Sequence, residues 1–204
     1  MKDNIRPGIS NKTLVASGIR HVDDEEAYIK TGMRKSGILF PYFDLNGHPI
    51  IDKVGEYCRL RLDEPIGSQK YHQRGGSGVH IYIPPGFTMQ FAAVLAYIII
   101  IEGEAKALSL FEAGYPAIGL PGFYGYSTNK ETREKIVIPE FEHILKRYSP
   151  KVIYFLGDND TCLNYRFSIA AVRLAELVAP VPVLLPRLPL DGPKGIDDLR
   201  EEMP

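Results

Sequence analysis

The chain has 204 residues, of which 45% are hydrophobic and 24% are charged, and its formal net charge is −1. This composition is typical of a globular protein, and the near-neutral charge excludes a polycation that binds nucleic acid without selection. Two cysteines are too few for a disulfide framework or a four-ligand zinc site, so we expect a reduced, cytoplasmic protein. No signal-peptide pattern is present, and the longest apolar run, residues 91–101, is too short to cross a bilayer. We therefore expect no membrane partner.

The first part of the chain predicts a short helix followed mainly by strands. The expected elements are a helix at 11–18 and strands at 37–43, 48–52 and 57–62, with a hairpin turn at Asn46-Gly47. The strand YCRLRL alternates, so Arg59 and Arg61 share one face and Cys58 lies on the other. That arginine face is either a solvated surface or a phosphate-binding one. Pro84-Pro85-Gly86 predicts a boundary between a β-rich subdomain, residues 1–88, and a second domain, residues 89–204.

The second part alternates between strand and helix patterns. Strands are expected at 97–101, 117–120, 152–156 and 182–185, and helices at 105–113, 139–148 and 164–178. Continuous apolar strands separated by helices are typical of a parallel, doubly wound α/β sheet with helices on both faces. Binding sites in such sheets lie beyond the carboxyl ends of the strands.

Acidic residues follow several of the predicted strands. Glu102 comes directly after the strand at 98–101, and Asp158 and Asp160 come after the strand at 152–156. Asp197, next to Asp198, follows the last strand. Like charges at one edge repel, and a hard divalent cation such as Mg²⁺ or Mn²⁺ resolves the repulsion through carboxylate ligands and substrate phosphates. The edge is therefore predicted to bind a metal that serves phosphoryl transfer.

Each of these carboxylates also has an ordinary structural interpretation. Glu102 could be a helix-start carboxylate, the Asp158 and Asp160 pair an Asx turn and cap, and Asp197 the cap of a final helix. Two further features favour a site at this edge. Gly103 and Gly122 lie at strand exits, where a phosphate or another backbone can approach closely, and Lys106 lies one turn into the following helix.

The order strand–Glu-Gly–helix, strand–Gly, strand–Asp-x-Asp resembles the TOPRIM domain of DnaG-type primases, topoisomerases and some nucleases. The runs GILFPYFDLNGHPI, YCRLRLDEP and QKYHQRGGS are similar to the amino-terminal subdomain of a primase core. The EGEAKAL, AIGLPG and KGIDD runs resemble primase-like TOPRIM proteins of phages, plasmids and other mobile elements. The resemblance covers about residues 35–200.

This resemblance implies roles for particular residues. Glu102, Asp158 and Asp160 would be catalytic and would hold the metal, with Asp197 as a further ligand. The residues implied to contact template or incoming nucleotide are Arg59, Arg61, Lys70, Tyr71 and Lys106. Gly195-Ile196 stands where bacterial primases have the first Asp and the Pro of their last acidic motif, and the zinc module has no counterpart in this sequence.

Three hypotheses follow for the function. The first is a primase-type nucleotidyltransferase core that uses nucleoside triphosphates on a single-stranded DNA template, with a replicative helicase, fused or separate, as partner. The second is a TOPRIM nuclease that cleaves phosphodiesters. The third is a non-catalytic module that binds single-stranded DNA and partners a helicase.

Overall fold

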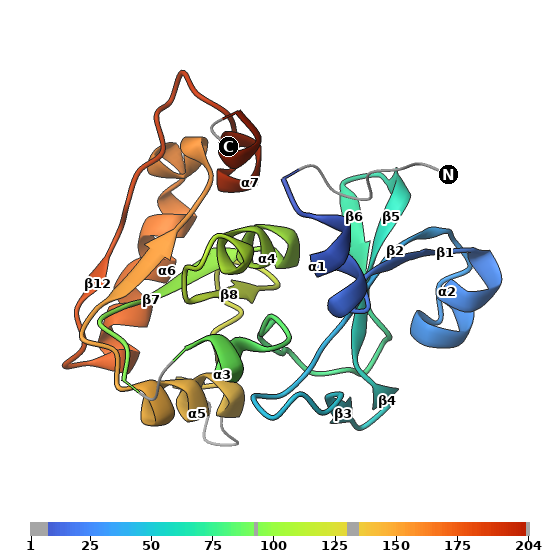
Figure 1. Cartoon of the computed structure of the whole chain (residues 1–204), viewed down its shortest axis with the longest axis horizontal. Coiled ribbons are helices and arrows are strands. Elements are labelled where there is room, and N and C mark those ends of the chain that lie inside the picture. The colour runs from blue at the N-terminus through green and yellow to red at the C-terminus, as the bar shows by residue number, and fades with distance from the viewer. Residues whose placement is uncertain (1–7, 92–93, 130–134, 203–204) are drawn as a thin grey trace. The chain divides into compact units, whose positions relative to one another are not determined.

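The structure, a computed structural model, describes residues 8–91, 94–129 and 135–202 (Figure 1). The chain divides into two compact units, Ser10–Gly78 and Val79–Pro204, and residues 8 and 9 belong with the second. The boundary between the two units therefore falls after Gly78, and not after residue 88 as expected. The physical reason is that Tyr82 exchanges two backbone hydrogen bonds of 2.8 Å with Gly119, which ties residues 79–83 to the second unit. No helix in the described ranges is long and apolar enough to cross a membrane.

The first unit contains an antiparallel sheet in the order β1-β2-β5-β6. Its strands are β1 (Arg20–Val22), β2 (Gly37–Pro41), β5 (Cys58–Ile66) and β6 (Gln69–His72). The unit also contains a small hairpin of β3 (Ile51–Asp52) and β4 (Gly55–Glu56) and the helices α1 (Asn11–Ala16) and α2 (Asp24–Thr31). The predicted β-rich character is confirmed, and so is the turn at Gly47, which has a φ of +82° beside the Phe43–Pro49 bridge.

Helix α2 and strand β1 were not expected from the sequence. The signal for the helix was present, because Asp23 caps α2 by accepting a hydrogen bond from the Glu26 N–H at 2.9 Å and three acidic residues follow in the first turn. Gly32 ends the helix in the left-handed conformation. Ala27 of α2 packs with Leu39 and Leu60 in the core of the sheet, so the helix covers the leucine face.

The second unit is built on a parallel sheet, as the sequence predicts. The strands are β7 (Ile98–Glu102), β8 (Ala117–Leu120), β11 (Ile153–Leu156) and β12 (Val183–Leu184), in the order β12-β11-β7-β8. The connecting elements are α4 (Glu104–Glu112), β9 (Ser127–Asn129), β10 (Lys135–Val137), α5 (Pro139–Tyr148), η1 (Asn159–Leu163) and α6 (Tyr165–Val178). Short helices α3 (Phe87–Gln90) and α7 (Ile196–Glu202) precede and follow the sheet.

The apolar run at 91–101 is not one buried element. Only its last four residues lie in β7, and Val94 is 68% exposed. Ala92 and Ala93 lie outside the described residues. The strand itself is buried on both sides, which explains why it is continuously apolar and does not alternate.

Helices α4 and α6 cover opposite faces of the parallel sheet. Ile100 pairs with Phe155, whose ring stacks on Phe167 of α6 at a centroid distance of 4.6 Å. The next residue, Ile101, pairs with Gly119, where an added Cβ would lie 3.3 Å from the Cβ of Ala107 in α4. Consecutive strand residues point to opposite faces, so this sheet is doubly wound.

Candidate functional site at the carboxyl edge of the parallel sheet

The strand order creates a switch point between β7 and β11. From β7 the chain runs through α4 to β8 on one side, and from β11 it runs through α6 to β12 on the other. Ligands of open α/β sheets bind at such a switch point, beyond the carboxyl ends of the strands. The geometry of the sheet therefore directs attention to the ends of β7 and β11.

The sequence-predicted carboxylates lie at these two strand ends. Glu102 is the last residue of β7, and Ile101 before it pairs with Leu156, the last residue of β11. Asp158 follows after one further residue, Gly157, and is the N-cap residue of η1. Asp160 lies within η1 and is exposed. The structure thus brings Glu102 and Asp158 to neighbouring strand ends.

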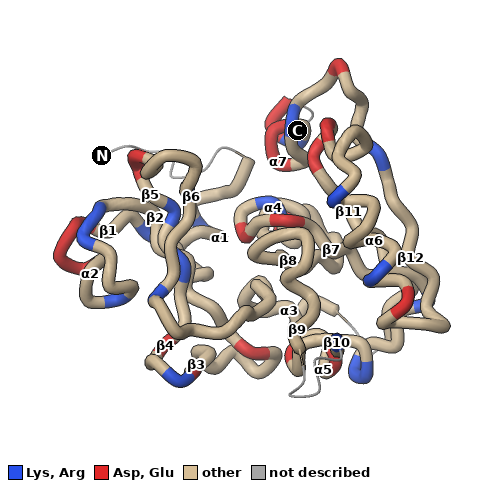
Figure 2. Tube along the Cα trace, turned by 180° about the vertical axis from the view of Figure 1, so that it is seen from behind, with Lys and Arg blue, Asp and Glu red and all other residues tan. Residues whose placement is uncertain are grey.

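Lys106 provides a positive charge at this edge. It lies in the first turn of α4, and its Nζ donates a hydrogen bond to Oδ1 of Asp158. The pair is partly buried, with 19% and 23% of the two side chains exposed. Lys194 forms an ion pair with Asp160 at 3.6 Å, which is too long for a hydrogen bond, and both of these side chains are mostly exposed. Figure 2 shows acidic and basic positions close together around the end of β11 and α7.

The loop before α7 is attached to η1 by Asn159. The Asn159 N–H donates to the carbonyl of Lys194 at 2.9 Å, and its side-chain amide donates to the carbonyl of Gly192 at 3.0 Å. Gly195 then lies in a tight space, since an added Cβ would be 2.5 Å from Oδ1 of Asp197 and 3.1 Å from Cε of Lys106. Asp197 therefore lies beside Lys106, although it is distant in sequence from β7 and β11.

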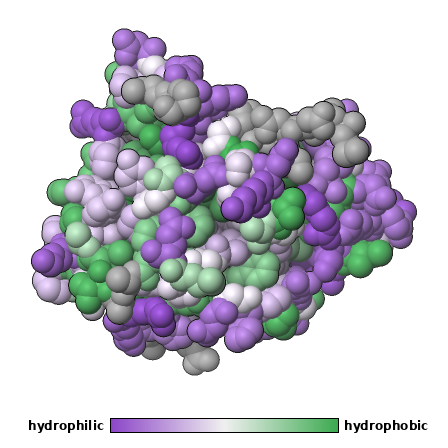
Figure 3. Space-filling model, in the orientation of Figure 1, coloured by the Kyte–Doolittle hydropathy of each residue, from purple (hydrophilic) through white to green (hydrophobic). Residues whose placement is uncertain are grey.

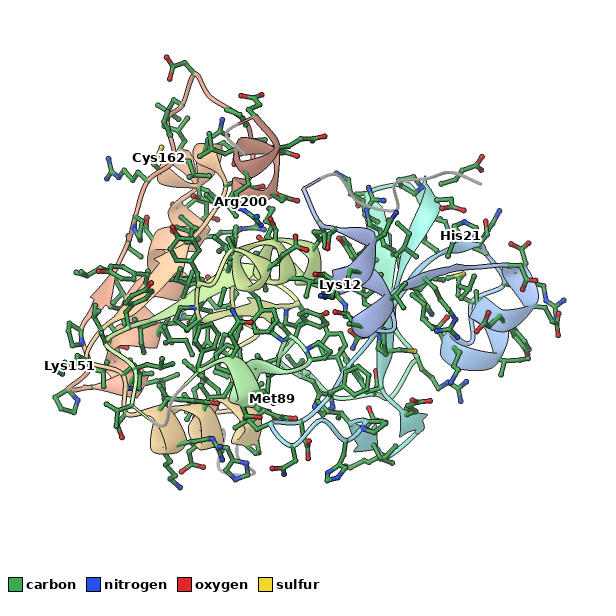
Figure 4. All side chains as sticks on the ribbon, in the orientation of Figure 1. Lys12, His21, Met89, Lys151, Cys162 and Arg200 are labelled. Atoms are coloured by element: carbon green, nitrogen blue, oxygen red, sulfur yellow. The ribbon has the colours of Figure 1, made fainter. Side chains whose placement is uncertain are left out.

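Helix α7 is attached to α4. The guanidinium of Arg200 donates to the Ser109 hydroxyl at 2.8 Å and to the carbonyl of the same serine. Figure 4 shows Arg200 between α7 and α4. Asp197 is buried at 6% exposure in the first turn of α7, and Asp198 accepts a hydrogen bond from the Gly195 N–H at 3.2 Å. The cap interpretation thus describes Asp198, whereas Asp197 points into the buried side.

The predicted glycines differ in their surroundings. Gly103 has a φ of +102°, a conformation that favours glycine, and its N–H donates to the Leu120 carbonyl at 2.9 Å. Gly122 has nothing within 4 Å of a possible Cβ, so it is open but not sterically required. Gly157 and Gly195 are the sterically required glycines of this edge, and neither was expected from the sequence. A Cβ on Gly157 would lie 2.5 Å from the Thr161 side chain.

The residues at this edge have the donor chemistry that a hard divalent cation prefers, because carboxylate oxygens are its usual protein ligands. In the described part of the chain, however, no group of three or more His, Cys, Asp or Glu side chains is arranged to hold a metal ion. Lysine ammonium groups lie next to the Asp158 and Asp160 carboxylates instead. The donor set therefore fits such a cation chemically, while lysines neutralise the two aspartates in this arrangement.

The first unit carries the predicted arginine face. Arg61 pairs with Tyr71 across β5 and β6, and the Arg59 guanidinium stacks over the Tyr71 ring at 4.8 Å. Phe40 pairs with Arg59 and lies on the same face. Three of the four predicted contact residues in this unit, Arg59, Arg61 and Tyr71, are thus together and half-buried. The fourth, Lys70, precedes Tyr71 on β6 and is exposed, so strand alternation turns it to the other face.

Neither cysteine is part of the carboxylate edge or of the arginine face. Cys58 is buried in the core of the first unit, and burial raises the pKa of its thiol to about 11, so it remains protonated at neutral pH. Cys162 is exposed at the end of η1, as Figure 4 shows. The visible face of the molecule carries mixed hydrophilic and hydrophobic residues (Figure 3).

Comparisons with known proteins agree with a primase-like fold. The chain is similar in structure to a DnaG primase catalytic domain bound to ssDNA, with a TM-score of 0.62 and 14% sequence identity over 96% of this chain and 64% of that one. It is also 35% identical over 115 residues to an uncharacterized protein of Picosynechococcus sp.. That match covers 50% of this chain and 11% of the relative, so the chain spans about a tenth of the relative's length.

The family model that matches the sequence is the domain of unknown function DUF3854, over residues 91–201. The match includes β7, β11 and all but the last residue of α7, and with them every carboxylate of the edge described above. It covers more than half of the 204 residues. The chain therefore belongs to the DUF3854 family.

Proposed function

We propose that this chain is the core of a primase-type nucleotidyltransferase whose second unit is a TOPRIM domain. The observation that carries the proposal is the position of Glu102 and Asp158 at the switch point of a doubly wound sheet, in a chain with a primase-like fold. The solved neighbour is described as bound to ssDNA, and single-stranded DNA is the partner we propose here. Nucleoside triphosphates are the proposed substrates, and a replicative helicase stays a predicted partner.

Glu102, Asp158 and Asp160 would hold Mg²⁺ or Mn²⁺, with Asp197 as a proposed further ligand. When bound, such an ion neutralises the charge that develops on phosphate oxygens during phosphoryl transfer. Gly103 leaves room for a phosphate at the start of α4 because it has no side chain. The edge itself thus contributes oxygen ligands and a backbone that can approach the substrate closely.

The Arg59–Tyr71 face would bind a single strand. Guanidinium groups neutralise phosphates, and aromatic rings offer a surface on which bases of any sequence stack. Arg59 and Arg61 provide the first property and Tyr71 provides the second, all on one face of the β5–β6 pair. This arrangement supports binding without sequence preference, which suits a template.

A second candidate function is a binding module without catalysis. Its support is the pairing of Asp158 with Lys106 and of Asp160 with Lys194, which gives each aspartate a partner within the protein. The nuclease alternative uses the same carboxylates and is separated from the primase only by its product.

The test is product analysis with labelled nucleotides, a single-stranded template and Mn²⁺ or Mg²⁺, beside a strand-cleavage reaction. We expect short metal-dependent oligomers from the natural chain and a loss of about 100-fold or more in Glu102→Gln and in Asp158→Asn. Glu176→Gln, an exposed carboxylate on α6, is the matched control and should keep full synthesis. Cleavage without synthesis would support the nuclease. Template binding without either product would support the binding module.

A further inference from the structure

Lys106 is the better shielded of the two lysines that pair with aspartates at the carboxylate edge. Its bond to Asp158 leaves 19% and 23% of the two side chains exposed, whereas the Lys194–Asp160 pair leaves 67% and 61% exposed. Charges that are shielded from water interact more strongly, so the first pair has the larger effect on what else can bind there. A cation that binds Asp158 must therefore compete with the ammonium group of Lys106.

The position of Lys106 is not one that helix stability favours. It lies in the first turn of α4, near the positive end of the helix dipole, where acidic side chains are preferred and lysine is unfavourable. Its contact with Asp158 offsets that cost. The explanation for a lysine at this position therefore lies in its partner on another segment, and not in the helix.

Three segments that are distant in sequence form the surroundings of Lys106. The residue itself comes from α4, Asp158 comes from the end of β11, and Gly195 comes from the loop before α7. Gly195 is buried, and because it has no side chain, Cε of Lys106 and Oδ1 of Asp197 can lie close to its backbone, where they would clash with a Cβ. The lysine stem thus lies close to the carboxylates of both Asp158 and Asp197.

We propose that Lys106 is a tethered counter-ion that closes the carboxylate edge, and that a divalent cation must displace its ammonium group from Asp158 in order to bind. Magnesium and manganese bind carboxylate oxygens directly, so they compete with the ammonium for the same oxygen. Two cations held close together in a partly buried site also repel each other. This inference rests on the proposed function, since it concerns the same carboxylates, and it adds a residue that controls when the metal binds.

The competition has a reciprocal consequence. If the ammonium lowers the affinity for metal, then metal binding must release the ammonium to the same extent in free energy. The released Lys106, one turn from Gly103, would then lie beside the space proposed for a substrate phosphate. Metal binding and phosphate binding would thereby become coupled through one side chain.

The test measures Mn²⁺ binding through the electron paramagnetic resonance signal of free Mn²⁺, without any activity assay. Lys106→Met removes the charge and keeps a similar length, and we expect it to bind Mn²⁺ about tenfold more tightly than the natural chain. Lys194→Met is the matched control, and its affinity should change by less than about threefold because that pair is exposed. Lys106→Arg keeps the charge and should bind as the natural chain does.

Thermal unfolding gives an independent measure. Without metal, Lys106→Met should unfold at a lower temperature, because Asp158 loses its partner. Saturating Mn²⁺ should then raise its Tm by more than it raises that of the natural chain, since tighter binding to the folded state stabilises more. If the methionine variant does not fold, Lys106→Gln, which can still donate to Asp158, serves for both measurements.

Equal Mn²⁺ affinity of Lys106→Met and the natural chain would overturn the inference. If Asp158→Asn then abolished that binding in both backgrounds, the metal site of the proposed function would stand without the lysine competition. Absence of Mn²⁺ binding in all variants would overturn both the inference and the metal dependence of the proposed function.

Discussion

The two units gather charged side chains in different ways. In the first unit, Arg59 and Arg61 share a face because they are two residues apart in one strand, and Tyr71 joins them from the adjacent strand of the same antiparallel pair. In the second unit, Glu102 and Asp158 are 56 residues apart and lie at adjacent strand ends because β7 and β11 are parallel neighbours. The first arrangement needs only alternation and one turn, whereas the second needs the strand order of a whole sheet.

The two arrangements also differ in how their cations are held. Arg59 lies over the Tyr71 ring at 4.8 Å, and an aromatic ring attracts a guanidinium without neutralising its charge. Lys106 is bonded to a carboxylate in a partly buried site, so its charge is compensated within the protein. The contact described for the first unit is thus between a cation and a ring, whereas the contact at the edge of the second unit is between two opposite charges.

The largest expected effect concerns stability, and it tests whether the edge of the second unit depends on tight packing at Gly157. Gly157→Ala places a methyl group 2.5 Å from the Thr161 side chain, which cannot move freely because its hydroxyl donates to the Asp158 carbonyl at 2.6 Å. We expect a loss of about 1–3 kcal/mol in the free energy of unfolding, measured by urea denaturation. Gly122→Ala is the control, because nothing lies within 4 Å of its added Cβ. Equal stability of the two variants would show that the end of β11 is not tightly packed.

A smaller effect is expected on the face of the first unit. Tyr71→Ala removes the ring that lies under Arg59, and we expect binding of a single-stranded oligonucleotide to weaken by about 1–2 kcal/mol, measured by fluorescence anisotropy. Arg59→Ala should weaken binding and also reduce its dependence on salt concentration, since fewer counterions are released. Lys70→Ala, on the opposite side of β6, is the control. A larger loss for Lys70→Ala than for Tyr71→Ala would mean that the other face binds the strand.

The smallest effect concerns a carboxylate of the second unit that lies outside the edge. Glu140 bonds to Nδ1 of His80 at 2.5 Å, and both side chains are largely buried. Burial acts to raise the pKa of Glu140, but the hydrogen bond with His80, a backbone hydrogen bond and the charges of His80 and His143 together lower the pKa below its usual value. A carboxyl group with a lowered pKa stabilises the folded state above its unfolded pKa, and this contribution is lost as the pH falls through the folded pKa.

Glu140→Gln should therefore destabilise the chain by about 1 kcal/mol at pH 7, and the difference should shrink as the pH falls from the ordinary carboxyl pKa through the lowered pKa of Glu140. The measurement is thermal unfolding of both chains between pH 3 and pH 7, for which ~4 is the midpoint of an ordinary carboxyl group. A constant difference across this range would show that shape, and not charge, explains the effect. The result sharpens the comparison, because it gives the free energy that one largely buried pair, His80–Glu140, contributes to stability away from the proposed site.

Much of the fold could be predicted from local sequence patterns. The strand and helix patterns of the second part, the buried isoleucines of β7 and the Asn-Gly turn of the first part all lie where they were expected. The domain boundary was less accurate, because Pro84-Pro85-Gly86 is a strong local signal whereas the bridge between Tyr82 and Gly119 is a long-range contact. Helix α2 was missed although its Asp23 cap is visible in the sequence.

The sequence by itself determined which residues end each strand, and therefore that Glu102 and Asp158 would lie at the carboxyl ends of two strands. Only the tertiary structure decided that those strands are neighbours, that Lys106 bonds to Asp158, and that Gly157 and Gly195 must be glycines. The physical reason is that strand ends follow from local periodicity along the chain, whereas salt bridges and close approaches depend on packing between segments. Such packing is set by the fold as a whole, and no single stretch of sequence encodes it.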